Sequence, residues 1–351
     1  MKTFCILSAF AFVGTCATTK YTTKIQNLKD SITIVDSTLV VKYSNTITAK
    51  ELSKALYTIS SDTFEGRKTG EKGQKLAARF LKDYYIKEQI ASPFGDSIYY
   101  QTIPESFFSN NIKASENVLA YIEGSEKPNE LIIISAHLDH LGIENTGEIF
   151  NGADDNGSGT TAIMEIAQAF QHAKNAGHGP KRSILFLHLT AEEIGTQGSL
   201  YYTQNPIFPL ENTIANLNID MIGRIDKIHT EDKNYIYLIG SDRLSKELHY
   251  LSEKVNNTYF NISLDYRFNA ENDENHYYSR SDHYNFALHG IPVIFYFNGE
   301  HADYHKTTDT PEKIDFQLLQ NRSRLIFATT WQLANQPNKI VVDAENELLL
   351  N

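Results

Sequence analysis

Short apolar runs recur along the chain and divide it into candidate strands. The clearest covers residues 131–134, where Leu and Ile follow one another without polar alternation. That pattern is typical of a strand that is buried on both faces. Runs of a similar kind predict the other strands, which cover residues 98–103, 116–122, 184–189, 215–219, 235–239 and 293–297.

Apolar residues three or four positions apart predict helices before and between these strands. This spacing begins after Thr48, and Leu76, Phe80 and Tyr84 would share one face of a helix over residues 73–85. Because strands alternate with helices, we expect an α/β sandwich. The remaining helices are predicted over residues 160–172, 246–256 and 316–334.

The N-terminal residues predict export. Lys2 precedes an apolar stretch over residues 4–13, which small residues and Cys16 follow. This pattern is typical of a signal peptide, and the stretch is too short for a membrane-spanning helix. Its end resembles a bacterial lipoprotein signal, in which a lipid on Cys16 would attach the protein to a membrane. Thr15 is not the usual small residue there, so simple cleavage nearby is the alternative. We expect a periplasmic or cell-envelope lipoprotein.

Composition divides the chain into a signal peptide over residues 1–16 and three further parts. Residues 17–45 are polar and Thr-rich, which predicts a tether and a peripheral strand. Residues 46–340 hold the alternating strands and helices and predict a single domain. Residues 341–351 are expected to form a C-terminal tail.

Charge and cysteine content limit the chemistry. The net charge of -11 and the pI near 5.6 argue against a nucleic-acid partner and against an anionic membrane surface. Cys5 and Cys16 are the only cysteines, and both fall in the predicted signal peptide. A metal site in the folded domain would therefore use His and carboxylate ligands.

Polar residues stand where the buried strand over residues 131–134 ends. His137 and Asp139 follow it closely, and Asp154 and Asp155 come after a short loop among glycines. Ligands of open α/β sheets collect at the carboxyl ends of strands. Acidic residues crowded against a His are costly unless a cation neutralises them. The pattern therefore predicts a metal site.

The same kinds of residue follow the later strands, within motifs that resemble one known family. The motifs are AHLDHLG, GADDNGSG, TAEEIGTQGS, NIDMIG, RSDHYNF with GIPVIFY, and YHKTTDT. In this order they resemble the co-catalytic di-zinc aminopeptidase and glutamate carboxypeptidase family, metallopeptidase family twenty-eight. The resemblance covers roughly residues 52–334. It implies a three-layer αβα sandwich around a mixed, largely parallel sheet, of the zinc exopeptidase type.

The resemblance also implies a site with two Zn²⁺ ions. Asp155 would bridge the ions, and Glu192 would be the general base that takes a proton from the attacking water. Tyr304 would donate a hydrogen bond to the oxyanion. His137 and Asp220 would complete one zinc site, and Glu193 and His305 the other.

Neighbouring residues receive weaker predictions. Asp139 would orient His137 by binding the ring nitrogen that faces away from the metal, and Arg280 and His283 would contact substrate or support the ligands. Asp154 is interpreted as an Asx turn. In relatives the peptide bond after the bridging Asp is cis, which implies a cis bond between Asp155 and Asn156. Four more histidines are interpreted as structural or exposed: His140, His188, His289 and His301.

The predicted function is that of an exported zinc aminopeptidase acting on peptides with a free N-terminus. A dipeptidase or carboxypeptidase stays open. A glutaminyl cyclase-like transferase is the alternative enzyme, and that branch works with one zinc and need not keep His137. A binding protein that kept the fold and lost catalysis is the alternative outside enzymes. Because all five ligands and Glu192 are present, hydrolysis with two metals is favoured.

Overall fold

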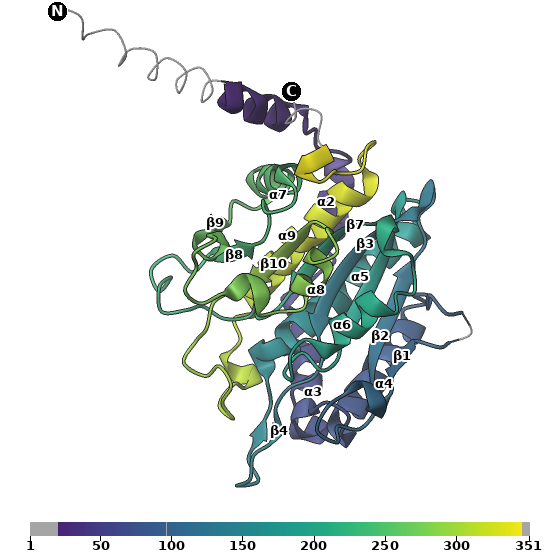
Figure 1. Cartoon of the computed structure of the whole chain (residues 1–351), viewed down its shortest axis with the longest axis vertical. Helices are drawn as coiled ribbons and strands as arrows, with labels where there is room; N and C mark the ends of the chain where they lie inside the picture. Colours follow the sequence, from purple (N-terminus) through teal and green to yellow (C-terminus); the bar gives the residue numbers. More distant parts are fainter. Residues whose placement is uncertain (1–19, 96, 346–351) are drawn as a thin grey trace, which may run out of the picture.

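The computed structural model describes residues 20–95 and 97–345. Within them, eight strands form one mixed sheet in the order β1-β2-β6-β3-β7-β10-β8-β9 (Figure 1). A separate hairpin pairs β4 (Gly142–Ile143) with β5 (Ile149–Phe150). The strands of the sheet are β1 (Tyr100–Ile103), β2 (Ser115–Ile122), β3 (Lys127–His137), β6 (Arg182–Leu189), β7 (Thr213–Ile219), β8 (Tyr235–Ile239), β9 (Ser263–Asp265) and β10 (Val293–Phe297).

The centre of the sheet is parallel. The pairs β6–β3, β3–β7 and β7–β10 all run in the same direction, whereas β1–β2, β2–β6 and β10–β8 are antiparallel. This mixed arrangement confirms the predicted fold class. Because the carboxyl ends of four neighbouring parallel strands meet at one edge, the loops that follow them are brought together there.

Helices cover both faces of the sheet. Ile132 and Ile134 of β3 belong to the larger core on one face, and Leu131 and Ile133 to the smaller core on the other. Burial on both sides explains why this strand shows no polar alternation. The helices are α2 (Ser37–Ser44), α3 (Ala49–Ile59), α4 (Lys72–Lys87), α5 (Gly159–Asn175), α6 (Gln197–Gln204), α7 (Lys246–Tyr259), α8 (His283–Ala287) and α9 (Phe316–Asn335).

The larger core contains buried residues of α2, α3, α4, α5, α7 and α9, and the smaller one contains Tyr202 of α6 and Phe286 of α8. The buried face of α4 is wider than predicted, since Leu81 is fully buried and Phe80 only partly. Short helical turns are η1 (Asp62–Arg67), η2 (Glu105–Phe107), η3 (Ala153–Ser158), η4 (Leu210–Asn212), η5 (Arg267–Asn269), η6 (Tyr277–Ser279), η7 (Pro311–Lys313) and η8 (Asp343–Glu345).

A tether and a peripheral strand were predicted over residues 17–45, and for the described part, residues 20–45, this prediction was wrong. Residues 20–31 are helical, and α2 follows them. Tyr43 stacks on Trp331 of α9 with ring centroids 5.7 Å apart, and its hydroxyl lies 2.7 Å from His178 Nδ1. These tertiary contacts outweigh the β-propensity of Val40 and Val41. The segment is therefore part of the domain and contributes to its core.

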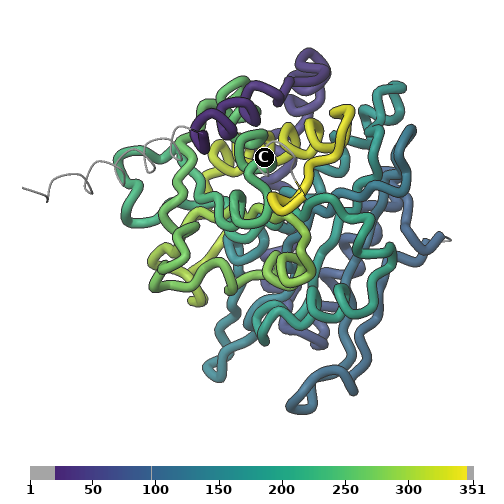
Figure 2. The backbone as a smooth tube through the Cα atoms, turned by 45° about the horizontal axis from the view of Figure 1, so that its top comes forward, coloured from purple at the N-terminus to yellow at the C-terminus, as the bar shows by residue number. Residues whose placement is uncertain are grey.

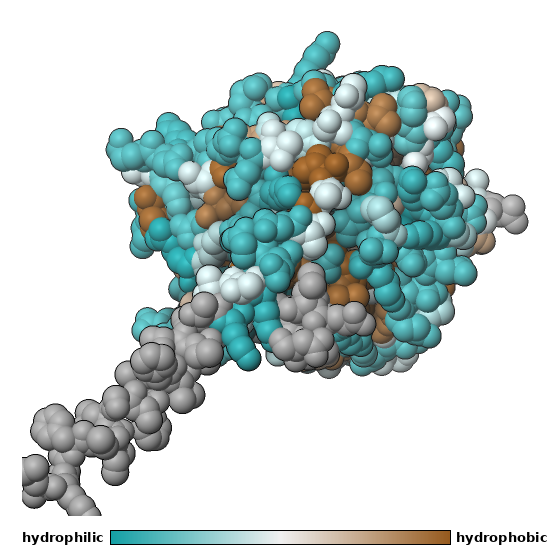
Figure 3. Space-filling view, turned by 90° about the horizontal axis from the view of Figure 1, so that it is seen from above, coloured by the Kyte–Doolittle hydropathy of each residue, from teal (hydrophilic) through white to brown (hydrophobic). Residues whose placement is uncertain are grey.

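The first and last described segments lie at the same end of the molecule, as the tube in Figure 2 shows. Gln332 of α9 donates to the Thr33 carbonyl at 2.8 Å, and Lys246 Nζ lies 2.6 Å from Asp343 Oδ2. Seen from this end, the surface is mainly hydrophilic, with hydrophobic residues in small groups (Figure 3). The predicted signal peptide and Cys16 lie outside the described residues.

A groove of about 790 Å³ opens at the amino ends of β7 and β10, where Thr213 and Pro292 line it together with residues 339–345. It lies at the opposite edge of the sheet from the acidic strand-end loops.

Among the helices of residues 20–95 and 97–345, none is both long and apolar enough to cross a bilayer.

Candidate metal centre

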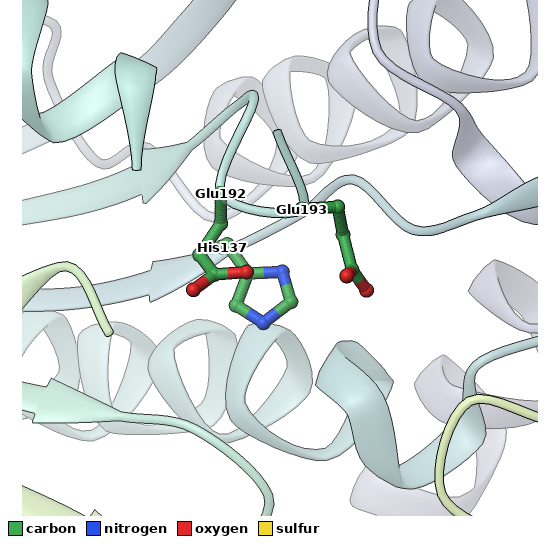
Figure 4. Close-up of side chains that lie close together, drawn as sticks. All are labelled: His137, Glu192 and Glu193. Atoms are coloured by element: carbon green, nitrogen blue, oxygen red, sulfur yellow. The ribbon is translucent and has the colours of Figure 1, made fainter. Parts of the chain in front are cut away.

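The predicted ligands come together at the carboxyl edge of the parallel strands. His137 is the last residue of β3, and the two glutamates lie on the loop after β6. Figure 4 shows Glu192 and Glu193 extending from this loop, with the Glu192 carboxylate against the His137 ring and the Glu193 carboxylate to one side of it. One ligand atom from each of these three residues lies within 4.8 Å of the others. Asp220 follows β7, and His305 lies on the loop after β10.

One group of ligand atoms surrounds the His137 ring. His137 Nε2 lies 3.2 Å from Asp155 Oδ1 and 3.3 Å from Asp220 Oδ1. All three side chains are buried. The group satisfies the distances expected of residues that could hold one metal ion.

A second group lies on the other side of Asp155. His305 Nε2 is 3.1 Å from Asp155 Oδ2 and 3.3 Å from Glu193 Oε2. His140 belongs to this group as well, because its Nδ1 lies 2.6 Å from Glu193 Oε1. The two oxygens of Asp155 therefore face different groups, which is the arrangement of a carboxylate shared by two ions.

The donor set fits a pair of zinc ions. Imidazole nitrogen and carboxylate oxygen are both zinc ligands, and a site with few protein ligands per ion leaves a position for water. The carboxylates of Asp155, Glu193 and Asp220 would repel one another without a cation between them. Burial acts to raise the pKa of Asp155, but nearby His140, His137 and His305 prevail and lower it well below its usual range.

Glu192 differs from the ligands beside it. Burial raises the pKa of the Glu192 carboxyl well above its usual range, and Asp220 and Glu193 add to this while His137 opposes it. For Glu193, contacts with His140 and His305 outweigh burial and Asp155, and the pKa is lowered. Two carboxyls whose surroundings push their pKa values apart are a mark of divided acid–base roles.

Asp139 contacts His137 mainly through its backbone carbonyl, whereas the prediction was a contact through its side chain. The nearest contact of His137 Nδ1 is the Asp139 carbonyl at 3.1 Å, whereas the carboxylate lies at 3.8 Å. The carboxylate accepts hydrogen bonds from the Glu192 N–H at 3.1 Å and the Thr69 hydroxyl at 2.6 Å. Asp139 thus holds the loop that presents Glu192.

Tyr304 and Arg280 border the cavity. The Tyr304 ring stacks on His305 with centroids 3.9 Å apart, and Arg280 donates to the Tyr304 hydroxyl at 3.4 Å. Arg280 also pairs with Glu300 at 3.0 Å and lies over the Tyr277 ring. The pocket is lined by His137, Asp155, Glu192, Asp220, Met221, Tyr277, Arg280, Phe295, Phe297, Glu300, Tyr304 and His305.

Two sequence-based assignments differ from the structure. His283 is fully buried and stacks on Phe295, with the ring centroids 4.8 Å apart. It does not line the pocket, so it cannot contact substrate there. Asp154 does not form an Asx turn. Its Oδ1 accepts from the Gly223 N–H at 2.7 Å, and its Oδ2 lies 3.1 Å from His301 Nε2. Its neighbour Asp155 is joined to Asn156 by a cis bond, as predicted.

Arg67 and Asp309 hold the loops that carry the ligands, and sequence reasoning missed both. Arg67 is 1% exposed and donates to the carbonyls of Leu138, Asn151 and Gly152 at 2.9, 2.7 and 2.8 Å. It therefore ties the end of β3 to the start of the Asp155 loop. Asp309 Oδ2 accepts from the Asp154 and Asp155 N–H groups at 3.0 and 3.1 Å. Its place in the motif YHKTTDT was the available signal.

A buried hydrogen-bonded chain reaches Asp220 from inside the sheet. Asn216 donates to Ser135 at 2.8 Å, and Ser135 donates to Asn218 at 2.7 Å. Asn218 donates to Ser281 at 2.9 Å, and the Ser281 hydroxyl donates to Asp220 Oδ2 at 2.7 Å. Such outer partners orient metal-binding carboxylates. Polar residues inside otherwise apolar strands were the missed signal.

The backbone is left-handed at or beside three predicted site residues. Ala191 precedes Glu192 with φ 61°, Met221 follows Asp220 with φ 61°, and His305 itself has φ 54°. Each such conformation costs on the order of 1–3 kcal/mol for a residue other than glycine and clusters at functional sites. The left-handed angles therefore point to a functional role for the loops that carry these residues.

The fold and the cluster define a class of protein, an α/β protein of the zinc exopeptidase type with a candidate metal centre at the carboxyl edge of its parallel strands. Solved structures share the fold. The LapA aminopeptidase of Legionella pneumophila superposes with a TM-score of 0.68 at 21% identity, over 88% of this chain and 77% of that one. BSAP, a zinc aminopeptidase from Bacillus subtilis, gives 0.64 at 16% identity, over 84% and 97%.

The sequence comparison settles the family. The pattern of peptidase family M28 matches residues 117–330. The chain therefore belongs to peptidase family M28. Leupeptin-inactivating enzyme 1 of Streptomyces exfoliatus is 30% identical over 259 residues, which cover 74% of this chain and 50% of that protein. The chain spans about half the length of the first curated relatives it matches.

Proposed function

We propose that this protein is an exported zinc-dependent exopeptidase, and specifically an aminopeptidase that removes the N-terminal residue of peptides. The observation that carries the proposal is the division of Asp155 between two ligand groups, with Oδ1 near His137 and Oδ2 near His305. This arrangement supports two ions in one centre. The names of the relatives, which include aminopeptidases and zinc metalloproteases, support the same reaction class.

In the proposed reaction, Glu192 transfers protons and Tyr304 stabilises the oxyanion. The zinc pair, when bound, supplies a Lewis acid for the scissile carbonyl and lowers the pKa of water. Glu192 takes a proton from the attacking water and returns it to the leaving amine. The Tyr304 hydroxyl, whose pKa burial raises, keeps its proton and donates to the oxyanion.

Release of amino acids from aminoacyl reporter substrates tests the aminopeptidase assignment. We expect turnover of substrates with a free α-amine and none after N-acetylation. Cleavage that instead requires a free C-terminus would identify a carboxypeptidase. Cyclisation of a glutaminyl peptide without hydrolysis would identify the transferase, and a protein that binds peptide without turnover would be the inactive relative.

Metal analysis of the purified protein should give two zinc ions per chain. Crystals grown with zinc should show them about 3.5–4 Å apart, as is usual for two-metal sites. Removing the metal with a chelator should abolish hydrolysis and lower the unfolding temperature, because metal binding stabilises the folded state. A single ion held without His137 would support the cyclase alternative instead.

Tyr304→Phe should lower kcat about 10²-fold with little change in KM, since loss of one oxyanion donor costs roughly 10²–10³ in kcat. The ring that stacks on His305 is retained, so zinc content should match the parent protein. Steady-state kinetics with zinc analysis measure both. A kcat within threefold of the parent would remove Tyr304 from the proposed mechanism.

The location remains a proposal. The sequence pattern over residues 1–16 supports export, and Cys16 is the proposed lipid attachment site. Mass spectrometry of the protein from its native membrane fraction would detect the lipid on Cys16, and a Cys16→Ser variant should be released from that fraction.

A further inference from the structure

His140, which the sequence analysis interpreted as structural or exposed, is buried and lies against a predicted zinc ligand. Its Nδ1 lies 2.6 Å from Glu193 Oε1 and 3.8 Å from Asp155 Oδ2. The residue is 1% exposed, and its ring centroid is 6.0 Å from that of His305. The short contact therefore belongs to the buried wall of the second ligand group.

The surrounding backbone is shaped to admit this ring. Gly152 has φ 54°, and a Cβ on it would come within 2.5 Å of His140 Cδ2 and 2.3 Å of the Asp155 carbonyl. The His140 N–H donates to the Arg67 carbonyl at 3.2 Å. The Phe150 ring packs edge-on against the His140 ring, with the ring centroids 6.4 Å apart. The imidazole is thus held in one orientation by elements on several sides.

The two oxygens of Glu193 have different partners. Oε1 faces His140, whereas Oε2 lies 3.3 Å from His305 Nε2, on the side where the second group of ligand atoms converges. A ligating carboxylate is commonly hydrogen-bonded through its other oxygen, which fixes its orientation. Within residues 20–95 and 97–345, the second nitrogen of His140, Nε2, is buried without a hydrogen-bond partner. Glu193 is therefore the side chain that the His140 ring can orient.

We propose that His140 is a positioning residue of the second metal site, where its Nδ1–H donates to Oε1 of Glu193 and leaves Oε2 to bind the ion. The inference rests on the proposed di-zinc function. It adds a residue whose effect is on the affinity of one ion. It also explains why Glu193 would serve as a ligand, whereas Glu192, whose carboxylate has no such histidine partner among the described residues, is left free to take the proton.

The test compares His140→Leu, which removes the donor, with His140→Asn, whose amide nitrogen can occupy the place of Nδ1. Zinc affinity is measured by competition with a chelating dye, and the two sites are followed by visible absorption of the cobalt-substituted protein. His140→Leu should weaken one ion about 10–100-fold, the usual effect of losing an outer partner. His140→Asn should stay within a few-fold of the parent protein.

His188→Leu is the matched control. His188 is equally buried, but its Nε2 contacts the Tyr85 hydroxyl at 2.6 Å within the core. This variant should lower thermal stability and leave both zinc affinities unchanged. If the Leu variant at position 140 does not fold, His140→Ser provides a smaller truncation for the same measurement.

The outcomes separate the two proposals. If the parent binds two zinc ions and hydrolyses aminoacyl substrates while His140→Leu binds both ions equally well, the positioning role is wrong and the function stands. If His140→Asn loses as much affinity as His140→Leu, the ring acts by packing and the hydrogen-bond inference fails. If the parent itself does not bind two ions, the proposed function fails and the role of His140 fails with it.

Discussion

Glu192→Gln should lower kcat by about 10²–10⁴-fold, the usual contribution of a general base, while both zinc ions stay bound. The amide keeps the size of the side chain but cannot accept the proton of the attacking water. Because the Glu192 N–H, and not its carboxyl, donates to Asp139, the loop should keep its position. The melting temperature should also remain near that of the parent protein.

Glu193→Gln should fail for a different reason. It removes the charge of a proposed ligand that lies against His305 and accepts from His140. One zinc should bind far more weakly, and stability should fall with it because metal binding is linked to folding. Excess zinc should restore part of the hydrolysis in this variant and none in Glu192→Gln.

Paired metal analysis and kinetics decide between these assignments. Loss of zinc from Glu192→Gln together with full occupancy in Glu193→Gln would reverse the two roles. Normal hydrolysis by both variants would rule out the di-zinc peptidase mechanism. Arg79→Met, on the exposed side of α4, is a suitable control and should change neither zinc content nor kcat.

The strands, and the clustering of the candidate ligands at their ends, could be predicted because their signals are local. The run before His137 marks a strand buried on both faces, and the change to His and Asp marks where it ends. Parallel pairing then places Asp220 and His137 at the same edge. The motif order supplied the family, and the match over residues 117–330 confirms it.

What could not be predicted depends on contacts between distant parts of the chain. The helix α2 was missed because its stability comes from Tyr43 packing on Trp331, which local propensity does not reveal. His140 carries no signal that separates it from other histidines until Glu193 is placed beside it. The short helix α6 has hardly any apolar periodicity of its own and is fixed by burial of Tyr202 in the smaller core.

Arg67 shows the same limit most clearly, since it ends the short turn η1 and its partners lie in distant parts of the chain. Its guanidinium makes four hydrogen bonds to carbonyls, of Leu138, Ile59, Asn151 and Gly152. Burial lowers its pKa to about 10, which leaves it charged at neutral pH, and Asp155 is the strongest of the acidic groups that oppose this shift.

Arg67→Met should therefore lower the free energy of unfolding by about 3–5 kcal/mol, the range expected when one side of a buried polar and charged arrangement is removed. The carbonyls of Leu138 and Gly152 would lose their partner, and the buried carboxylates behind the metal site would lose a nearby positive charge. Arg67→Lys should recover only part of the loss, because an ammonium group cannot reproduce the planar fork that spans these carbonyls.

Urea denaturation of the metal-free protein measures the effect without contributions from zinc, and Arg79→Met should stay within about 0.5 kcal/mol of the parent as an exposed control. Zinc titration of Arg67→Met adds a second readout. Because Arg67 joins the loop after His137 to the loop before Asp155, its loss should weaken binding of the ion that these two residues are proposed to share. A loss below 1 kcal/mol with unchanged zinc affinity would mean that the two loops hold their positions without Arg67.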